Sequence, residues 1–232
     1  MEKERIFTQE ELEEMGTQTV DLLERAIDSG DKEKAKKLAV RMHKEAMSWH
    51  DFSTDWLAAL LTSIAKHYGD DAVHKSLEES LSVTHKETLD LFDGVNFRRR
   101  VQLCAGVVRS HCRPLEVTED DEKVVFKMKP CGTGGRMILQ GKYDPPYNFH
   151  KVEKAKPMTF GRENFPIYCC HGHFFASLPV AMGRAPAFLE IPSDKLGEEP
   201  CEIRLYKDPK AIPSGVYEKC GIKPESLPQE EI

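Results

Sequence analysis

A cysteine and a glycine-rich turn adjoin near the middle of the chain, at Cys131, Gly132, Gly134, Gly135 and Arg136. Glycines let backbone N–H groups point at an anion or an oxyanion, and Arg136 adds a positive charge that can orient a carboxylate. The turn lacks the Gly-Lys-Ser/Thr ending of a phosphate-binding loop, and its glycine spacing differs from the dinucleotide fingerprint. We therefore expect Cys131 to be a nucleophile and the other four residues to bind substrate. The alternative is a turn with a buried structural thiol.

A second group of reactive side chains stands further along the chain, at Cys169, Cys170, His171 and His173. Thiolates and imidazoles bind zinc, and on a helix Cys169 and His173 would share a face because they are four residues apart. Only one dense pair is present, so Cys131 or a histidine of the helical half is the natural further ligand. The pattern predicts a zinc or iron centre at Cys131, Cys169, Cys170, His171 and His173. The alternative is a helix start with one packed cysteine and capping histidines.

A histidine stands beside a carboxylate at His50-Asp51. Such a carboxylate fixes the tautomer of an imidazole that acts as a general base or as a metal ligand. We expect Asp51 to orient His50, and either His50 or His171 to be the catalytic base for the thiol. In the alternative, the pair caps a helix start and the neighbouring Trp49 and Trp56 pack in the core.

The composition limits the classes of protein to which this chain can belong. Its 232 residues include 33 Lys+Arg and 39 Asp+Glu, giving a net charge of −6, which argues against nucleic acid as the main partner. The longest apolar run, residues 56–61, is far shorter than the roughly 20 residues that span a membrane. The N-terminal residues lack the apolar segment of a secretory signal, and the cysteine number is odd. We expect a cytoplasmic protein with reduced thiols.

The first half of the chain has the apolar spacing of helices. Thr8 and Glu11 form a capping box at the start of an amphipathic run that ends at Ser29-Gly30. Around residues 48–51 the chain is predicted either to continue a helix or to turn. Cys104 falls on the last helix and is expected in the core. The further predicted helices cover residues 31–46, 56–68, 70–81, 85–92 and 96–112.

The second half has a mixed pattern. Residues 115–118 and 123–128 flank a polar turn and predict a β-hairpin. Other strands are predicted at 136–139, 187–191 and 201–206, a short helix at 167–182, and a draped or mobile tail from Asp208. The fold class is therefore α+β: a helical N-terminal half packed on a small antiparallel sheet with one further short helix. The regions are 1–113, 114–208 and 209–232, within one integrated domain.

Several of these motifs occur together in one known family. Cys131 at the end of a strand and Tyr168-Cys169-Cys170 at a helix precede the late strand Cys201-Glu202-Ile203-Arg204-Leu205. With His50-Asp51 and the turn at residues 119–123, this arrangement resembles the L-2-amino-thiazoline-4-carboxylic acid hydrolase family and related uncharacterised bacterial proteins, over residues 40–208. The resemblance implies hydrolysis of a small C–N bond, as in the opening of an amidine-like ring.

We therefore expect a hydrolase of a C–N bond in a small nitrogen- or sulfur-containing molecule, which is thiazoline-, amidine- or amide-like. Two mechanisms stay open: Cys131 as covalent nucleophile, or a metal held by cysteine and histidine that activates water. One cysteine cannot do both. The alternative function is a non-catalytic metal-binding or thiol redox-sensing protein. The expected partner is a small-molecule substrate, without nucleic acid or membrane, and homo-oligomer formation is left open.

Overall fold

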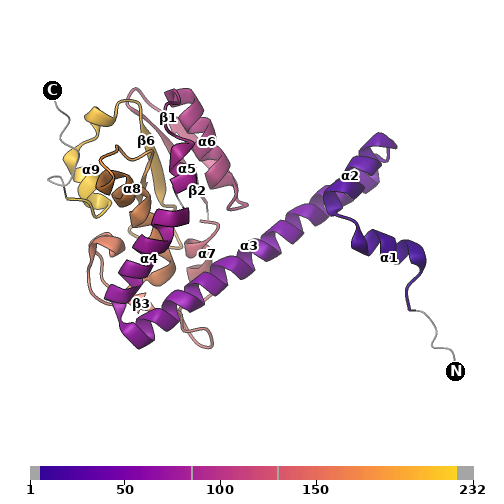
Figure 1. Cartoon of the computed structure of the whole chain (residues 1–232), viewed down its shortest axis with the longest axis horizontal. Helices are drawn as coiled ribbons and strands as arrows, with labels where there is room; N and C mark the ends of the chain where they lie inside the picture. The colour runs from indigo at the N-terminus through magenta and orange to yellow at the C-terminus, as the bar shows by residue number, and fades with distance from the viewer. Residues whose placement is uncertain (1–5, 85, 130, 224–232) are drawn as a thin grey trace. The chain divides into compact units, whose positions relative to one another are not determined.

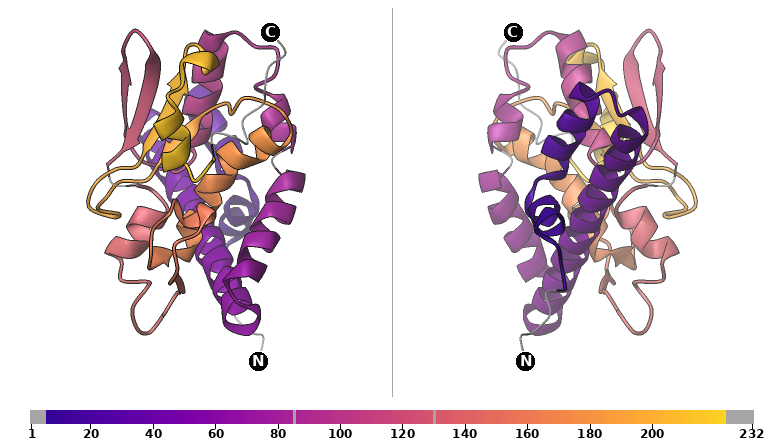
Figure 2. Two further views of the ribbon diagram at one scale, coloured as in Figure 1. Left: turned by 90° about the vertical axis from the view of Figure 1, so that its left-hand side faces the viewer. Right: turned by 90° about the vertical axis from the view of Figure 1, so that its right-hand side faces the viewer.

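The computed structural model describes residues 6–84, 86–129 and 131–223 (Figures 1 and 2). The expectations for residues 1–5, His85, Pro130 and residues 224–232 lie outside this described part. The chain divides into two compact units, Met1–Ser53 and Thr54–Ile232. A helical first half precedes a small antiparallel sheet, so the predicted α+β class is confirmed.

The first unit is helical. It contains α1 (Gln9–Gly16), α2 (Thr19–Asp28) and the first part of α3 (Lys32–Tyr68). The predicted capping box is present, because Glu11 N–H donates to the Thr8 hydroxyl at 3.2 Å and Thr8 N–H donates to the Glu11 carboxylate at 2.8 Å. The apolar faces of α2 and α3 bury a small cluster made by Leu22, Ala26 and Leu38.

Helix α3 is continuous across residues 48–51, where the sequence left a turn open. No glycine or proline interrupts it, and the Ser48 hydroxyl donates to the backbone carbonyl four residues earlier at 2.9 Å. Trp49 and Trp56 are 67% and 62% exposed. The alternative in which His50 and Asp51 start a helix and the two tryptophans pack in the core is therefore wrong.

The second unit holds the strands. The main sheet has the antiparallel order β1-β2-β6-β5, made by β1 (Leu115–Glu119), β2 (Lys123–Met128), β6 (Glu202–Tyr206) and β5 (Leu189–Ile191). A second sheet pairs β3 (Lys151–Val152) with β4 (Phe165–Pro166). The helices around them begin with the end of α3 and continue with α4 (Asp70–Thr84), α5 (Lys86–Asp90) and α6 (Phe97–Arg109).

Strands β1 and β2 form the predicted hairpin, and α6 packs on the sheet beside it (Figure 1). The hairpin turn is held by Asp120, whose carboxylate accepts the N–H groups of Glu122 at 2.9 Å and Lys123 at 2.8 Å. Cys104 of α6 is fully buried, as predicted, in a cluster with Phe126 of β2. Helix α6 and the sheet thus share one core, although the residues near 113 mark the change from helices to strands.

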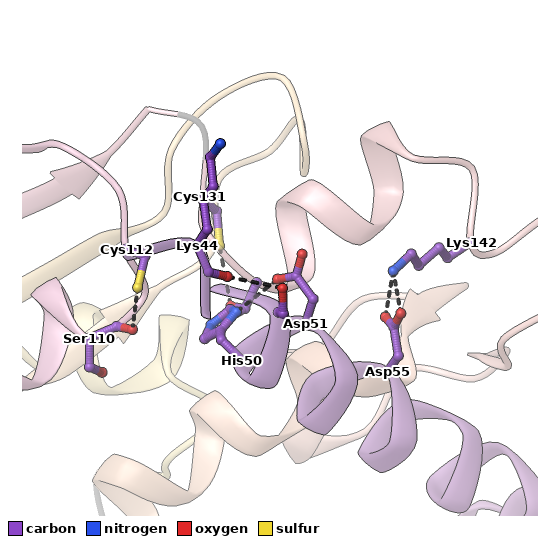
Figure 3. A network of polar contacts seen from close by, with 10 residues as sticks. Lys44, His50, Asp51, Asp55, Ser110, Cys112, Cys131 and Lys142 are labelled. Carbon is purple, nitrogen blue, oxygen red and sulfur yellow. Dashed lines mark hydrogen bonds and ion pairs between the residues drawn. The ribbon is translucent and has the colours of Figure 1, made fainter. Parts of the chain in front are cut away.

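Residues 136–139 form part of a helix, α7 (Gly134–Leu139), so the predicted third strand is wrong. A run of four apolar or basic residues fits both periods, and periodicity alone cannot decide between helix and strand. The helical hydrogen bonds begin with Met137 N–H to the Thr133 carbonyl at 3.0 Å. Just beyond α7, Lys142 donates to both carboxylate oxygens of Asp55 on α3, at 2.6 and 2.5 Å (Figure 3).

The predicted helix at 167–182 consists of two elements. A 3₁₀ turn, η2 (Ile167–Cys170), comes first and α8 (His171–Ala181) follows. Cys169 and Cys170 therefore lie on a tighter turn than His173. Because a 3₁₀ turn has about three residues per turn, the predicted shared face of Cys169 and His173 does not apply.

The chain after Asp208 is folded as far as it is described. The turn η3 (Pro209–Ala211) leads to α9 (Ser214–Lys219), so the prediction of a draped or mobile tail is wrong for residues 209–223. Apolar residues at helical spacing explain this result. They pack against α8 and β5 and are Val216, Tyr217, Cys220 and Ile222.

Candidate functional site

A largely enclosed cavity lies within the second unit, between α6, the main sheet, the turn after β2 and the start of α8. Its volume of about 70 Å³ gives room for roughly five water molecules. Most of the wall is apolar and includes four phenylalanine rings, Phe126, Phe165, Phe175 and Phe188. The polar and ionisable side chains on the wall are His111, Cys131, Thr133, Tyr168, Cys169, His171, Glu190, Glu199 and Cys201.

The glycine-rich turn brings Cys131 to this cavity. Strand β2 ends at Met128, so Cys131 lies beyond the strand and not at its end. A Cβ atom on Gly134 would lie 2.3 Å from Cys169 Sγ, and one on Gly135 would lie 2.7 Å from Cys131 Cβ. Only glycine leaves space for both cysteines to approach the same piece of backbone.

Thr133 connects Cys131 to Tyr168. Cys131 Sγ lies 3.6 Å from Thr133 Oγ1, and the Thr133 side chain hydrogen-bonds to Tyr168. Thr133 and Tyr168 are buried, and burial raises the pKa of the Tyr168 phenol, which keeps it neutral. The half-buried Cys131 thiol is therefore positioned by a row of neutral polar groups on the cavity wall.

Glu190, on β5, is a half-buried carboxyl group on the cavity wall. Its side chain has no hydrogen-bond or ion-pair partner among the residues that the structure describes. Burial alone raises the pKa of this carboxyl to about 7. The start of α8 leaves space for it, because a Cβ on Gly172 would lie 2.6 Å from Glu190 Oε2. The arrangement places a carboxyl that is near half-ionised at neutral pH beside a thiol-lined cavity.

Two further thiols line the cavity. Burial raises the pKa of Cys169 well above its ordinary value and that of Cys201 to about 12. The negative charges that Cys131 and Glu190 can carry act on both thiols in the same direction. At neutral pH these thiols stay protonated and are poor nucleophiles.

Two histidines complete the polar part of the wall. His171 Nδ1–H donates to the Tyr168 carbonyl at 2.5 Å, and His111 Nδ1–H donates to the Val108 carbonyl at 3.0 Å. A donating Nδ1 places the lone pair of a neutral imidazole on Nε2. His171 therefore has the tautomer of a general base, and it lines the same cavity as Cys131.

Within the second unit, four of the residues predicted to belong to the site do not line the cavity. A Cβ on Gly132 would lie 2.3 Å from the His111 carbonyl oxygen, so Gly132 packs against the end of α6. Arg136 lies on α7, outside the cavity wall. Cys170 is fully buried in the apolar core, where its Sγ donates to the Pro166 carbonyl at 3.8 Å. His173 is buried as well.

The residues of the predicted zinc or iron centre do not all face the cavity: Cys131, Cys169 and His171 line it, whereas Cys170 and His173 do not. His173 Nδ1–H donates to the Cys220 carbonyl at 2.8 Å, away from the cavity. In the described part of the chain, no group of three or more His, Cys, Asp or Glu side chains has an arrangement that could hold a metal ion. The metal centre at Cys131, Cys169, Cys170, His171 and His173 stays a prediction.

The His50-Asp51 pair lies in the first unit. His50 Nδ1 and Asp51 Oδ1 are 3.1 Å apart, so Asp51 orients the imidazole as predicted (Figure 3). The pair and the cavity belong to different units of the chain, and the catalytic role of the pair stays a prediction.

Six polar residues of the cavity were not expected from the sequence as part of a site: Glu190, Cys201, Thr133, Tyr168, His111 and Glu199. Glu190 and Cys201 lie near strands far along the chain from Cys131, without a local motif. The sequence feature that could have indicated Glu190 is a carboxylate between two apolar residues of a short strand, at Leu189-Glu190-Ile191. A charged residue in such a place is rarely buried without a function.

Comparison with known proteins gives no relative. No family model, curated protein or solved structure matches this chain. The resemblance to the thiazoline carboxylate hydrolases therefore stays a prediction. Within the described residues, no helix is both long and apolar enough to cross a membrane. The function must be argued from the cavity.

Proposed function

We propose that this protein is a hydrolase that cleaves a C–N bond in a small molecule, with Cys131 as the nucleophile. One observation carries this proposal: a single cavity is lined by the Cys131 thiol, the His171 imidazole and the Glu190 carboxyl, which has no partner among the described residues. A nucleophile, a base and a group that can hold nitrogen are the parts that covalent hydrolysis needs.

The steps follow from these three groups. His171 Nε2 takes the proton of the Cys131 thiol, and Sγ forms a bond to the carbon of the C=O or C=N group. The C–N bond then breaks, and the departing nitrogen takes its proton from His171. Glu190 accepts an N–H of that nitrogen and orients it. Water next adds to the carbon, gives a proton to His171, and releases the product; the Cys131 sulfur leaves and regains its proton.

Cys131 is preferred as nucleophile over its neighbours on the wall. Burial raises the pKa values of Cys169 and Cys201, and proton loss from either would place a charge in an apolar wall. Cys131 lies on a glycine turn and is connected through Thr133 to Tyr168. Its position is therefore fixed by polar groups as well as by packing against the apolar cluster around Phe126.

The test is release of ammonia or amine from a panel of small amides, amidines and cyclic thiazolines. We expect Cys131→Ser to lower kcat/KM by at least about a thousandfold and Glu190→Gln by about a hundredfold, with the fold retained. Cys112→Ser is the matched control, because Cys112 lies off the cavity wall and its Sγ donates to the Ser110 carbonyl at 3.4 Å (Figure 3). Full activity of Cys131→Ser would overturn the proposal.

A thiol redox sensor is the second candidate function. The observation in its favour is that three thiols, of Cys131, Cys169 and Cys201, line one cavity. Oxidation of one thiol to a sulfenic acid, followed by attack of a second, would form a disulfide with loss of water. Peptide mapping after mild peroxide treatment tests this function. A disulfide between two of these cysteines, without turnover of any compound in the panel, would favour the sensor over the hydrolase.

A further inference from the structure

The Glu190 carboxyl lies on the cavity wall and has no hydrogen-bond or ion-pair partner among the described residues, and this feature bears on the class of substrate. Buried carboxylates in folded proteins are paired or hydrogen-bonded, because an unpaired charge in an apolar environment is costly. The Glu190 carboxyl has neither among the described residues, and it lies on the wall of the cavity. A molecule that enters the cavity can therefore supply the partner of this carboxyl.

We propose that the substrate presents a cationic amidinium or guanidinium group to Glu190, and that the cavity rejects molecules that carry a carboxylate. This inference rests on the proposed function and names the substrate class for the same site. A planar group with two N–H donors on one edge matches the two oxygens of a carboxylate, which gives a bidentate, charge-assisted pair.

The charges around the cavity favour a cation. The residues that line it include no lysine or arginine. The positive charge of Arg162 acts on the Cys201 thiol from outside the wall. Its guanidinium already donates to the Pro192 carbonyl at 2.8 Å and to the Asp194 carboxylate at 3.2 Å. A ligand carboxylate in the cavity would be repelled by the Glu190 carboxylate, and the wall has no lysine or arginine to pair with it.

The apolar wall favours the same class of ligand. Phenylalanine faces attract cations, and four phenylalanine rings line the cavity. Two of them, Phe175 and Phe188, have ring centroids 5.3 Å apart and planes tilted by 44°, so the wall that Glu190 shares is in part aromatic. A cavity of about 70 Å³ takes only a few heavy atoms, which fits a small planar head group.

Three molecules of nearly equal shape test the inference: acetamidinium, acetamide and acetate each have four heavy atoms in one plane, and they carry charges of about +1, 0 and −1. Binding is measured by titration calorimetry on Cys131→Ser, in which turnover is removed. We expect acetamidinium to bind with a dissociation constant no lower than tens of micromolar, acetamide to bind more weakly, and acetate not to bind measurably.

The variants then assign the selectivity. In the Cys131→Ser background, Glu190→Gln should weaken acetamidinium binding about 10- to 100-fold. Glu198→Gln on the exposed loop, outside the cavity wall, should leave binding unchanged. Acetate binding as tightly as acetamidinium, or acetamidinium binding that ignores the Glu190 substitution, would overturn the inference.

A second readout needs no change at Glu190. A cation that pairs with the carboxylate displaces its proton, so at about pH 6 the heat of acetamidinium binding should depend on the ionisation enthalpy of the buffer. The titratable groups that face Glu190 are Tyr168, Cys169, Cys201 and Cys220, whose pKa values burial raises, and His171, His111, Cys131 and Glu199 share the wall. Proton release that persists in Glu190→Gln would assign it to another group of the wall and contradict the inference.

The two proposals can fail separately. Glu190-dependent binding of acetamidinium, together with no ammonia release from any compound by the unmodified protein, would overturn the hydrolase and uphold the ligand class. Turnover that requires Cys131 but occurs only with neutral or carboxylate-bearing compounds would uphold the hydrolase and overturn the ligand class.

Discussion

The two faces of the segment at residues 168–173 hold the same types of residue in opposite surroundings. On the cavity face, Cys169 and His171 line a space that a small molecule can enter. On the core face, Cys170 is fully buried among apolar side chains and His173 donates to a backbone carbonyl. A thiol and an imidazole therefore have a chemical role on one face and a packing role on the other.

The difference teaches that the neighbours of a reactive residue decide its chemistry. Gly134 leaves space for the Cys169 sulfur and Gly172 leaves space for the Glu190 carboxyl, so glycines shape the cavity face. On the core face, the Cys170 thiol has apolar neighbours and one carbonyl acceptor. Substitutions on the two faces should therefore change different properties of the protein.

The largest expected effect is on the pH dependence of stability and belongs to the cavity face. The pKa of the Glu190 carboxyl is about 7 in the folded chain, against 4.5 as its ordinary value. The folded chain keeps this proton where the unfolded chain loses it, so the free energy of unfolding falls as pH rises from about 4.5 to about 7. This fall amounts to about 3 kcal/mol of the free energy of unfolding, and Glu190→Gln should remove it.

Urea unfolding of the unmodified protein and Glu190→Gln at about pH 4 and about pH 8 measures this difference. Thiol ionisation in the unfolded chain near pH 8 acts equally on both proteins, so the difference between them reports on Glu190. Equal pH dependence in the two proteins would show that the Glu190 carboxyl is not buried as described, and the comparison of the two faces would lose its cavity side.

The next effect concerns the two neighbouring cysteines. Cys170→Ser places a hydroxyl in the apolar core and should lower the free energy of unfolding by about 1–2 kcal/mol. Cys169→Ser changes the cavity wall, where a hydroxyl can meet water, and should cost less than about 1 kcal/mol. Urea midpoints with unchanged m-values check both. A larger cost for Cys169→Ser would reverse the assignment of the faces.

The smallest effect concerns the two histidines. Burial lowers the pKa of His173, with His74 adding to the shift and the bond to the Cys220 carbonyl opposing it. The unfolded chain takes up this proton first, so the free energy of unfolding falls as pH drops below the ordinary histidine value. His173→Gln should reduce this loss in acid. His171→Gln is the control and should keep the loss of stability that His173 causes in acid. If the free energy of unfolding of His173→Gln falls in acid as much as that of the unmodified protein, the prediction is contradicted.

The sequence predicted the local features well. The capping box at Thr8, the β-hairpin around Asp120 and the core position of Cys104 each depend on residues close together in the chain. The run at 136–139 was placed in a strand because four residues do not distinguish the two periods. The tail after Asp208 was predicted to be mobile because its prolines and charges outweighed the apolar spacing of α9.

The site was predicted only in part. Cys131, Cys169 and His171 were found by residue type, and all three line the cavity. Sequence cannot say which of two adjacent cysteines faces inward, since this depends on the 3₁₀ turn that holds them. Glu190 was missed because its role depends on the fold, which brings a late strand against the start of α8.

The most direct test of the central claim is the rate at which each cysteine is alkylated by iodoacetamide in the folded protein, resolved by peptide mapping near neutral pH. We predict that Cys131 reacts first, faster than the more peripheral Cys112, because His171 shares its cavity and can take its proton. Cys169, Cys170 and Cys201 should react slowly, since burial raises their pKa values. If Cys131 reacts no faster than Cys112, the account of Cys131 as a nucleophile is contradicted.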